Sequence, residues 1–273
     1  MSDGTSTLAR PARRTRAGLP VRRPVPGMTT LKGLIPLMIL LVIWQLAGSD
    51  SSLSFPPPSS WIDSLRELAD HGSLGPALRT TLVTFALSLV IATVIGAAVG
   101  MAIGASRRVD RALTPTLDFF RSLPPPAVVP VAALILGISL RMSVTVVVIA
   151  IVWPILLNTA GAMRDIPAVR IEMSRTLGLG RFERIIKVVI PSLLPAIMVG
   201  VRVAVSISLV VTLLVEIIGS SDGVGQLLAE RQQSFDAAAV WGLLLLIGVL
   251  GFAINALIAA AEQRLLRNWP EAN

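Results

Sequence analysis

The stretch TTLVTFALSLVIATVIGAAVGMAIG, residues 80–104, contains no charged side chain. An α-helix needs about 20 mainly apolar residues to cross the hydrocarbon core of a bilayer. This stretch, extended back to residue 77, therefore predicts a membrane-spanning helix. Five further apolar stretches are near or above the same length, at residues 31–48, 113–138, 142–161, 188–216 and 238–261.

The composition of the whole chain also indicates a membrane protein. Of its 273 residues, 53% are hydrophobic and 15% are charged, whereas an average soluble domain has about 25% charged residues. We therefore expect an all-α integral membrane protein with six transmembrane helices. The chain has no cysteine and one histidine, which excludes disulfides, thiolate metal sites and histidine clusters. Neither of its two lysines, Lys32 and Lys187, is in a G-x-x-x-x-G-K-[ST] loop, so the sequence contains no phosphate-binding P-loop.

The loops between the apolar stretches alternate in charge. Two loops are rich in arginine, at residues 105–111 and 162–187. In the loops at residues 49–76 and 217–237, most of the charged residues are acidic. Basic loops stay on the cytoplasmic side of a membrane. The alternation therefore predicts that both termini of the six-helix chain are cytoplasmic.

The first 30 residues are basic and contain four prolines. They predict a disordered cytoplasmic tail, followed by a membrane domain over residues 31–267 and a short tail at 268–273. A nucleic-acid-binding arm is the alternative, but a basic flank before an apolar helix is what membrane topology requires, so we expect no nucleic-acid partner.

The first apolar stretch and the following Ala47, Gly48 and Ser49 also resemble a signal peptide. Its length exceeds the usual ~7–15 residues, which favours a retained anchor.

The third apolar stretch is interrupted by RSLPPP at residues 121–126. Three consecutive prolines remove three backbone donors and stop a helix. Broken backbone within a bilayer is tolerated only where it is buried in protein or faces a water-filled cavity. The stretch either begins as an interfacial helix or is a discontinuous helix that lines a pathway. Arg121, Pro124 and Pro125 are therefore candidate pathway residues.

Two more features concern packing and charge within the apolar stretches. Ala92, Gly96, Gly100 and Gly104 recur at four-residue spacing, which lets another helix approach closely, within the chain or from a second subunit. Charged candidates for the pathway are Arg202 and Glu216, besides Arg121 and its neighbour Asp118. The two arginines, Arg121 and Arg202, lie within predicted membrane segments and favour an anionic solute. The alternative is that these residues serve structure, with Arg202 paired to an acid or to backbone carbonyls rather than in contact with solute.

Residues 162–191 predict a short rigid helix that projects from the membrane between two spans. Pro167 can open a helix, because its missing amide donor costs nothing in the first turn. Gly178 can close the same helix in the left-handed conformation after the last turn. Pro191 then marks the entry into the fifth membrane helix. The alternative is an ordinary basic loop.

This segment carries a resemblance to a known family. EMSRTLGLGRFERIIKVVIP, residues 172–191, resembles the EAA signature of ABC importer permeases, which reads E-A-A, three residues, G, nine residues, I-x-L-P. Glu172, Gly178 and Pro191 match the signature, and Met173 and Ser174 replace its two alanines. The segments SFPPPSSW, LDFFRSLPPPAVVP, PILLNTAGAMRDIP and TLLVEIIGSSDGVGQLL are similar, in the same order, to the nitrate, sulfonate and taurine branch of that family.

The resemblance implies a type I ABC importer permease in the bacterial plasma membrane. Two copies of such a permease form the pore, and two separate ABC ATPase subunits bind ATP and Mg, so this chain would hold no cofactor and would not be an enzyme. An extracytoplasmic binding protein would deliver a small anionic solute such as a sulfonate, taurine, nitrate or a carboxylate. The coupling helix would span about residues 168–178. The implied ATPase-coupling residues are Glu172, Met173, Ser174, Arg175, Leu177, Gly178 and Pro191.

Two other classes of function compete with this one. A secondary transporter driven by an ion gradient needs ionisable residues deep in the membrane, and Glu216 lies near the end of the fifth predicted helix instead. A membrane enzyme would have few catalytic side chains available, because the chain has one histidine and no cysteine.

Overall fold

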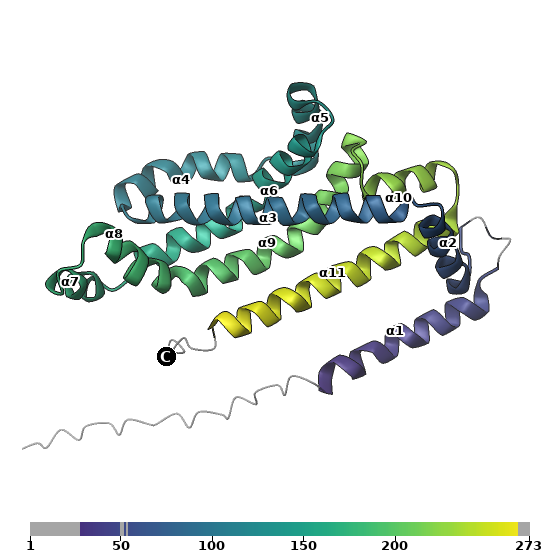
Figure 1. The fold of residues 1–273 in the computed structure, drawn as a ribbon, viewed down its shortest axis with the longest axis horizontal. Helices are drawn as coiled ribbons and strands as arrows, with labels where there is room; N and C mark the ends of the chain where they lie inside the picture. The colour runs from purple at the N-terminus through teal and green to yellow at the C-terminus, as the bar shows by residue number, and fades with distance from the viewer. Residues whose placement is uncertain (1–27, 50–51, 53, 267–273) are drawn as a thin grey trace, which may run out of the picture. The chain divides into compact units, whose positions relative to one another are not determined.

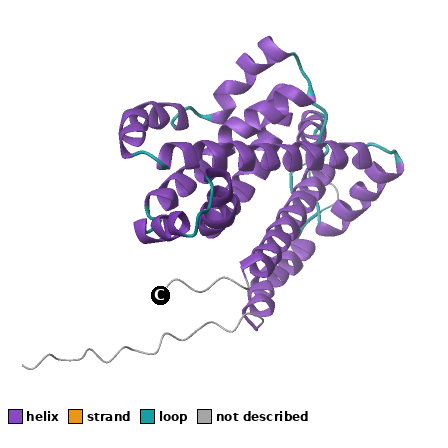
Figure 2. Ribbon diagram, turned by 60° about the vertical axis from the view of Figure 1, so that its left-hand side comes forward, coloured by secondary structure: helices purple, strands orange, loops and turns teal. Residues whose placement is uncertain are grey.

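The computed structural model describes residues 28–49, 52 and 54–266. Most of the predicted N-terminal tail and the whole of the predicted C-terminal tail lie outside the described residues. The regular structure in the described part of the chain is helical throughout (Figure 2). The chain divides between Ile43 and Trp44 into two units. The first predicted span corresponds to α1 (Met28–Ala47), most of which belongs to the first unit.

The second unit contains all the other helices (Figure 1). In chain order these are α2 (Pro58–Asp70), α3 (Leu74–Gly104), α4 (Arg107–Arg121), α5 (Pro125–Leu136), α6 (Leu140–Arg164), α7 (Ala168–Thr176), α8 (Arg181–Arg184), the π-helical turn η1 (Ile185–Val189), α9 (Ile190–Gly219), α10 (Val224–Gln233) and α11 (Ala237–Leu266).

Within the described residues, four helical stretches are long and apolar enough to cross a membrane: Leu74–Gly104, Leu140–Arg164, Arg181–Gly219 and Ala237–Leu265. They correspond to the second, fourth, fifth and sixth predicted spans. The pair formed by α4 and α5 makes a fifth if it is counted as one bent span. The described apolar part of α1, Met38–Ala47, is shorter than a span, so the total of six stays a prediction.

The core of the second unit is built around α6, which packs against both α3 and α9. The predicted stripe of small residues on α3 lies in the first of these contacts. A Cβ atom added to Gly100 would stand only 2.6 Å from the carbonyl oxygen of Leu156. On the other side of α6, a Cβ on Gly200 would stand 2.7 Å from the Cα of Ile155. The stripe therefore serves packing within the chain, one of the two alternatives that the sequence left open.

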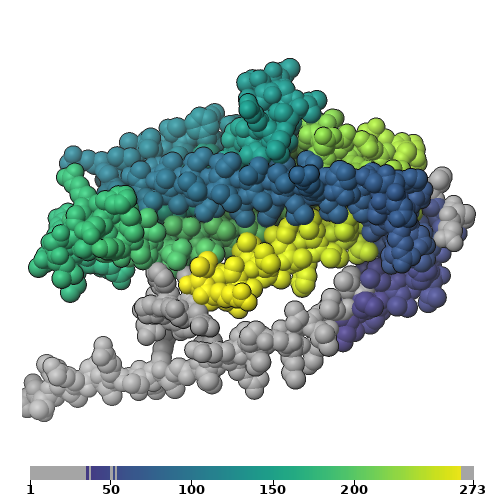
Figure 3. All heavy atoms as spheres, in the orientation of Figure 1, coloured from purple at the N-terminus to yellow at the C-terminus, as the bar shows by residue number. Residues whose placement is uncertain are grey.

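The predicted break in the third apolar stretch is confirmed. Helix α4 ends at Arg121, α5 begins at Pro125, and their axes are bent by 85°. Pro124 precedes α5 in an extended conformation. The following Pro125 disfavours helical backbone at Pro124, and the ring of Pro124 itself permits the extended form. The teal residues of α5 stand out from the rest of the second unit (Figure 3). Leu134 and Ile135 at the end of α5 are 88% and 75% exposed.

An aromatic cluster ties α2 to the beginning of α11. Trp61 is 4% exposed, and its ring stacks on Trp241 with 5.6 Å between the ring centroids. Trp44, the first residue of the second unit, meets both rings edge-on. Such aromatic pairs each add ~0.5–1.5 kcal/mol beyond the area that they bury. They fix α2 at the same end of the unit as α10.

The close approach of α3 to α6 can be tested with matched glycine substitutions. We expect Gly100→Ala to lower the thermal stability of the purified protein in detergent, because overpacking costs ~1–3 kcal/mol. Gly248→Ala on α11 is the control, because a Cβ there meets nothing within 4 Å and alanine favours a helix by ~1 kcal/mol over glycine. A melting temperature that falls equally for both variants would contradict this packing.

Candidate functional site

Helix α7 and the loop that follows it stand at one end of the second unit, and α10 stands at the other (Figure 1). Helix α7 follows Pro167, as predicted. Its last turn is closed by two backbone hydrogen bonds, from Gly178 N to Arg175 O (2.9 Å) and from Leu179 N to Ser174 O (3.1 Å). Gly178 has a φ of 72°, so these bonds form a Schellman motif, which needs a left-handed residue at this position. The predicted helix stop at Gly178 is confirmed.

One face of α7 is fixed to the membrane helices. Ser174 is 2% exposed, and its hydroxyl donates to the carbonyl of Ile171 at 2.6 Å. Ile171 packs against the main hydrophobic core. The Arg170 guanidinium donates to the hydroxyl of Ser192 in the first turn of α9 at 2.9 Å. These contacts make α7 a rigid projection from the unit.

The opposite face of α7 is exposed and partly apolar. Val169, Met173 and Leu177 are 62%, 63% and 77% exposed, and their four-residue spacing places them along one side of the helix. We call these three residues the α7 stripe. Val169 was not among the predicted coupling residues, although its position four residues before Met173 could have indicated it.

The other predicted coupling residues surround this stripe. Glu172, Arg175 and Gly178 are exposed, whereas Pro191 is half-buried in the first turn of α9. Glu172 and Arg175 form no ion pair within 4.0 Å, as judged over the described residues. The Glu172 carboxylate is therefore free to meet a partner outside the chain.

The structure does not gather the predicted pathway residues at one place. Arg121 forms an ion pair with Asp118 one turn earlier on α4, at 3.0 Å. Arg202, in the middle of α9, lies 3.6 Å from the carboxylate of Glu262 on α11. Both arginines thus have acidic partners, which was the alternative to contact with solute. Pro124 immediately precedes α5, and Pro125 is its first residue.

Glu216 has a structural environment of its own. It is 1% exposed, and its Oε2 accepts hydrogen bonds from the Thr81 hydroxyl (3.0 Å) and from the Gly225 amide (2.8 Å). The Thr81 hydroxyl in turn accepts from the Val224 amide at 2.9 Å. The first amides of a helix have no partner within the helix, and the helix dipole favours an anion there. Glu216 and Thr81 together cap α10 and fasten it to α3 and α9.

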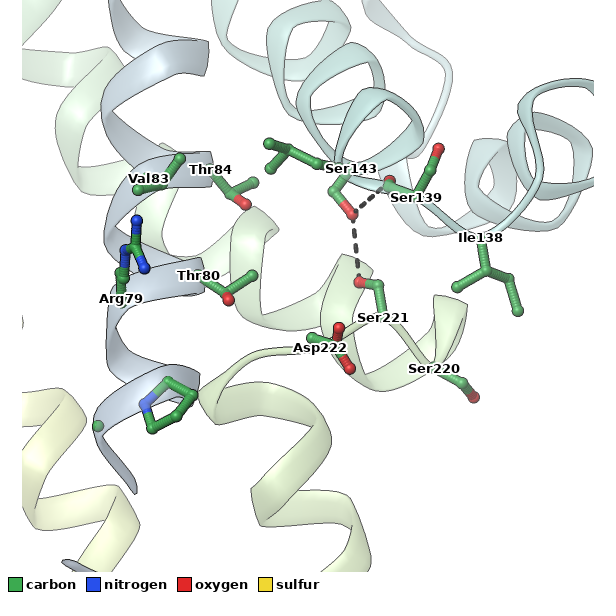
Figure 4. A pocket seen from close by; sticks show the side chains of 13 residues that line it. Arg79, Thr80, Val83, Thr84, Ile138, Ser139, Ser143, Ser220, Ser221 and Asp222 are labelled. Carbon is green, nitrogen blue, oxygen red and sulfur yellow. Dashed lines mark hydrogen bonds between the residues drawn. The ribbon is translucent and has the colours of Figure 1, made fainter. Parts of the chain in front are cut away.

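A cavity of about 560 Å³ opens beside this cap (Figure 4). Its walls are the first turns of α3, the beginning of α6 and the link from α9 to α10. Ser220 in that link adopts a left-handed conformation with a φ of 47°, which is uncommon outside glycine. The Ser143 hydroxyl donates to that of Ser221 at 3.2 Å and joins the link to α6. Two charged residues, Arg79 and Asp222, line the cavity, and sequence reasoning missed both.

The cap on α10 can be tested by removing its carboxylate. We expect Glu216→Ala to lower the melting temperature and to speed hydrogen exchange of the Val224 and Gly225 amides, because a buried donor that loses its acceptor costs ~1–3 kcal/mol. The control is Glu230→Ala, which removes an exposed carboxylate whose partner is a side chain of α10 itself. Unchanged exchange at Gly225 in Glu216→Ala would contradict the assignment of the cap.

The sequence matches the family described as "Binding-protein-dependent transport system inner membrane component" over residues 92–267. It is 27% identical over 240 residues to the putative aliphatic sulfonates transport permease protein SsuC of Bacillus subtilis (strain 168), with 87% of each chain covered. It is 30% identical over 240 residues to the bicarbonate transport system permease protein CmpB of Synechococcus elongatus, covering 84% of this chain and 86% of that one. Identity to the nitrate import permease protein NrtB of Leptolyngbya laminosa is 27% over 279 residues, covering 96% and 98% of the two chains.

Among solved structures, the chain resembles one chain of the MetNI methionine ABC transporter in an inward-facing conformation. The TM-score is 0.61 at 22% identity, and the match covers 73% of this chain and 97% of that chain. This likeness concerns the fold alone and agrees with the predicted type I importer permease fold. The chain belongs to the family of binding-protein-dependent transport system inner membrane components, and is a multi-pass permease of an ABC importer.

Proposed function

We propose that two copies of this chain form the membrane pore of an ATP-driven importer for a small solute that carries an oxyanion. Two separate ABC ATPase subunits bind ATP and Mg, and an extracytoplasmic binding protein delivers the solute. The chain itself holds no cofactor and catalyses no reaction. The ion-gradient-driven transporter is the alternative.

The α7 stripe is the observation that carries this proposal. Three large apolar side chains are exposed on a helix that is held to the membrane helices by the Arg170–Ser192 hydrogen bond and by the packing of Ile171. Exposed apolar patches on a projecting element are typical of protein–protein contacts. Because α7 is rigid, movement of an ATPase subunit bound to the stripe is transmitted to α6 and α9. Glu172 and Arg175 beside the stripe supply charged groups for the same contact.

The proposed orientation places the α7 end in the cytoplasm and the α10 end on the extracytoplasmic side. The arginines in the first turns of α4 and those in the segment that contains α7 lie at the first end, as the positive-inside rule requires. With α1 as a retained span and the bent α4–α5 pair as another, the chain crosses the membrane six times and both termini are cytoplasmic.

The proposed class of solute is supported by the similar permeases more than by Arg121 and Arg202. Arg121 and Arg202 favoured an anion, but each has an acidic partner. The relatives named for sulfonates, bicarbonate and nitrate support a solute with an oxyanion.

The exposed apolar end of α5 supports a second copy, because Leu134 and Ile135 contact little within one chain.

Reconstitution tests the proposal directly. The chain is purified with a cognate ATPase, placed in liposomes and supplied with the binding protein. We expect a complex of two permeases and two ATPases by mass, and uptake that stops when ATP, the binding protein or the lysine of the ATPase P-loop is removed. Uptake that persists without the ATPase and follows an imposed ion gradient would support the secondary transporter instead. A complex with one permease copy would refute the homodimer.

Gly178 provides a sharper test of coupling through α7. Valine at a φ of 72° is strained by ~1 kcal/mol or more, whereas a Cβ at this position meets no other atom within 4 Å. We therefore expect Gly178→Val to leave expression normal and to reduce both binding of the ATPase and uptake. The control is Gly180→Val in the same loop, where φ is −61°. Equal uptake in the two variants would count against a role of α7 geometry in coupling.

A further inference from the structure

The cavity at the α10 end has an unusual balance of charge. Of the 13 residues that line it, Arg79 and Asp222 alone are charged, one of each sign. They come from different elements, Arg79 from the second turn of α3 and Asp222 from the link between α9 and α10 (Figure 4). The cavity therefore presents one cation and one anion to the same space.

Neither charge is neutralised by a neighbour in the chain. Arg79 and Asp222 are both exposed, and neither forms an ion pair or a side-chain hydrogen bond with another described residue. Two other arginines at this end of the unit do have acidic partners: Arg66 pairs with Asp63 at 3.1 Å, and Arg231 with Asp236 at 3.9 Å. The Arg79 guanidinium and the Asp222 carboxylate are thus available to a ligand, although they are not close enough to satisfy one another.

The remaining polar groups in the cavity are hydroxyls. Six of the lining residues supply one each, namely Thr80, Thr84, Ser139, Ser143, Ser220 and Ser221. A hydroxyl both donates and accepts hydrogen bonds, so these groups serve either end of a dipolar ligand. The link that carries Asp222 is held in place by the Ser143–Ser221 hydrogen bond and by the α10 cap. The site is therefore positioned before a ligand arrives.

This charge balance distinguishes between classes of solute. Arginine binds carboxylate and sulfonate groups through paired, charge-assisted hydrogen bonds. A simple anion in this cavity would gain attraction from Arg79 but would be repelled by Asp222. A molecule with an oxyanion at one end and an ammonium group at the other satisfies both side chains.

We propose that this cavity is a subsite for a small zwitterion, an amino acid or an aminosulfonate. Its oxyanion is bound by Arg79 and its ammonium group by Asp222. The inference rests on the proposed function, since the extracytoplasmic end is where an importer receives its solute. It narrows the oxyanion-bearing solute to one that also carries a positive charge.

The test compares ligands that differ in one amino group. Binding of taurine and of ethanesulfonate, and of β-alanine and of propionate, is measured on the permease–ATPase complex in nanodiscs without ATP or binding protein. We expect the wild-type complex to bind at least one zwitterion ten or more times tighter than its amine-free partner. Arg79→Ala should abolish binding of both members of that pair. Asp222→Asn should weaken the zwitterion selectively and bring the two affinities within about threefold.

Matched controls come from the paired charges at the same end. Arg66→Ala and Asp63→Asn change the same residue types at exposed positions on α2, and we expect them to leave both affinities unchanged. Melting temperatures without ligand verify that all four variants are folded.

Three outcomes would overturn the inference: no binding of either zwitterion, equal or tighter binding of the amine-free anions, or discrimination that survives in Asp222→Asn. The binding measurement is independent of ATP-driven uptake. A complex that imports with ATP but binds no zwitterion here would retain the proposed function and lose this subsite. A complex that binds the zwitterion but imports without the ATPase would lose the proposed function instead.

Discussion

The backbone-to-backbone contact of α6 with its two neighbours is the constraint on which the rest of the second unit depends. Gly100 on α3 and Gly200 on α9 approach α6 so closely that a single methyl group at either position would meet its main chain. In a bilayer, where lipid tails are as apolar as leucine, such close packing replaces the hydrophobic effect as the force between helices. Helix α7 lies between α6 and α9 in the chain. The packing of α6 against α9 therefore also determines where α7 projects.

The two ends of the unit are stabilised in different ways. At the α7 end, the Arg170–Ser192 hydrogen bond and the packing of Ile171 against the core hold the helix, and the Schellman motif stops it. At the α10 end, Glu216 and Thr81 join the consecutive helices α9 and α10 to α3, which is distant from both in sequence. A buried carboxylate that caps a helix is costly to place and strongly directional once placed. The α10 end is thereby a prearranged structure, suited to hold the cavity in one shape.

Local patterns in the sequence predicted the local structure well. The apolar stretches located α3, α6, α9 and α11, the prolines located the break before α5, and Gly178 located the end of α7. Each of these depends on neighbours within a few residues. The pairing of Arg202 with Glu262, and the meeting of Arg79 with Asp222 at one cavity, depend on which helices pack together. No periodicity or motif records those contacts, so the pathway residues that were chosen from the proline break and from charge do not lie together in the fold.

The α7 stripe has a consequence for the life of the subunit before assembly. Val169, Met173 and Leu177 are exposed on a helix within an arginine-rich segment, and water is a poor solvent for three neighbouring apolar side chains. If an ATPase subunit covers the stripe, as proposed, a copy that is synthesised without that subunit displays a surface of the kind that chaperones and proteases bind. Balanced synthesis of the two subunits, as from one transcript, would keep this surface covered and spare the orphan chain from degradation.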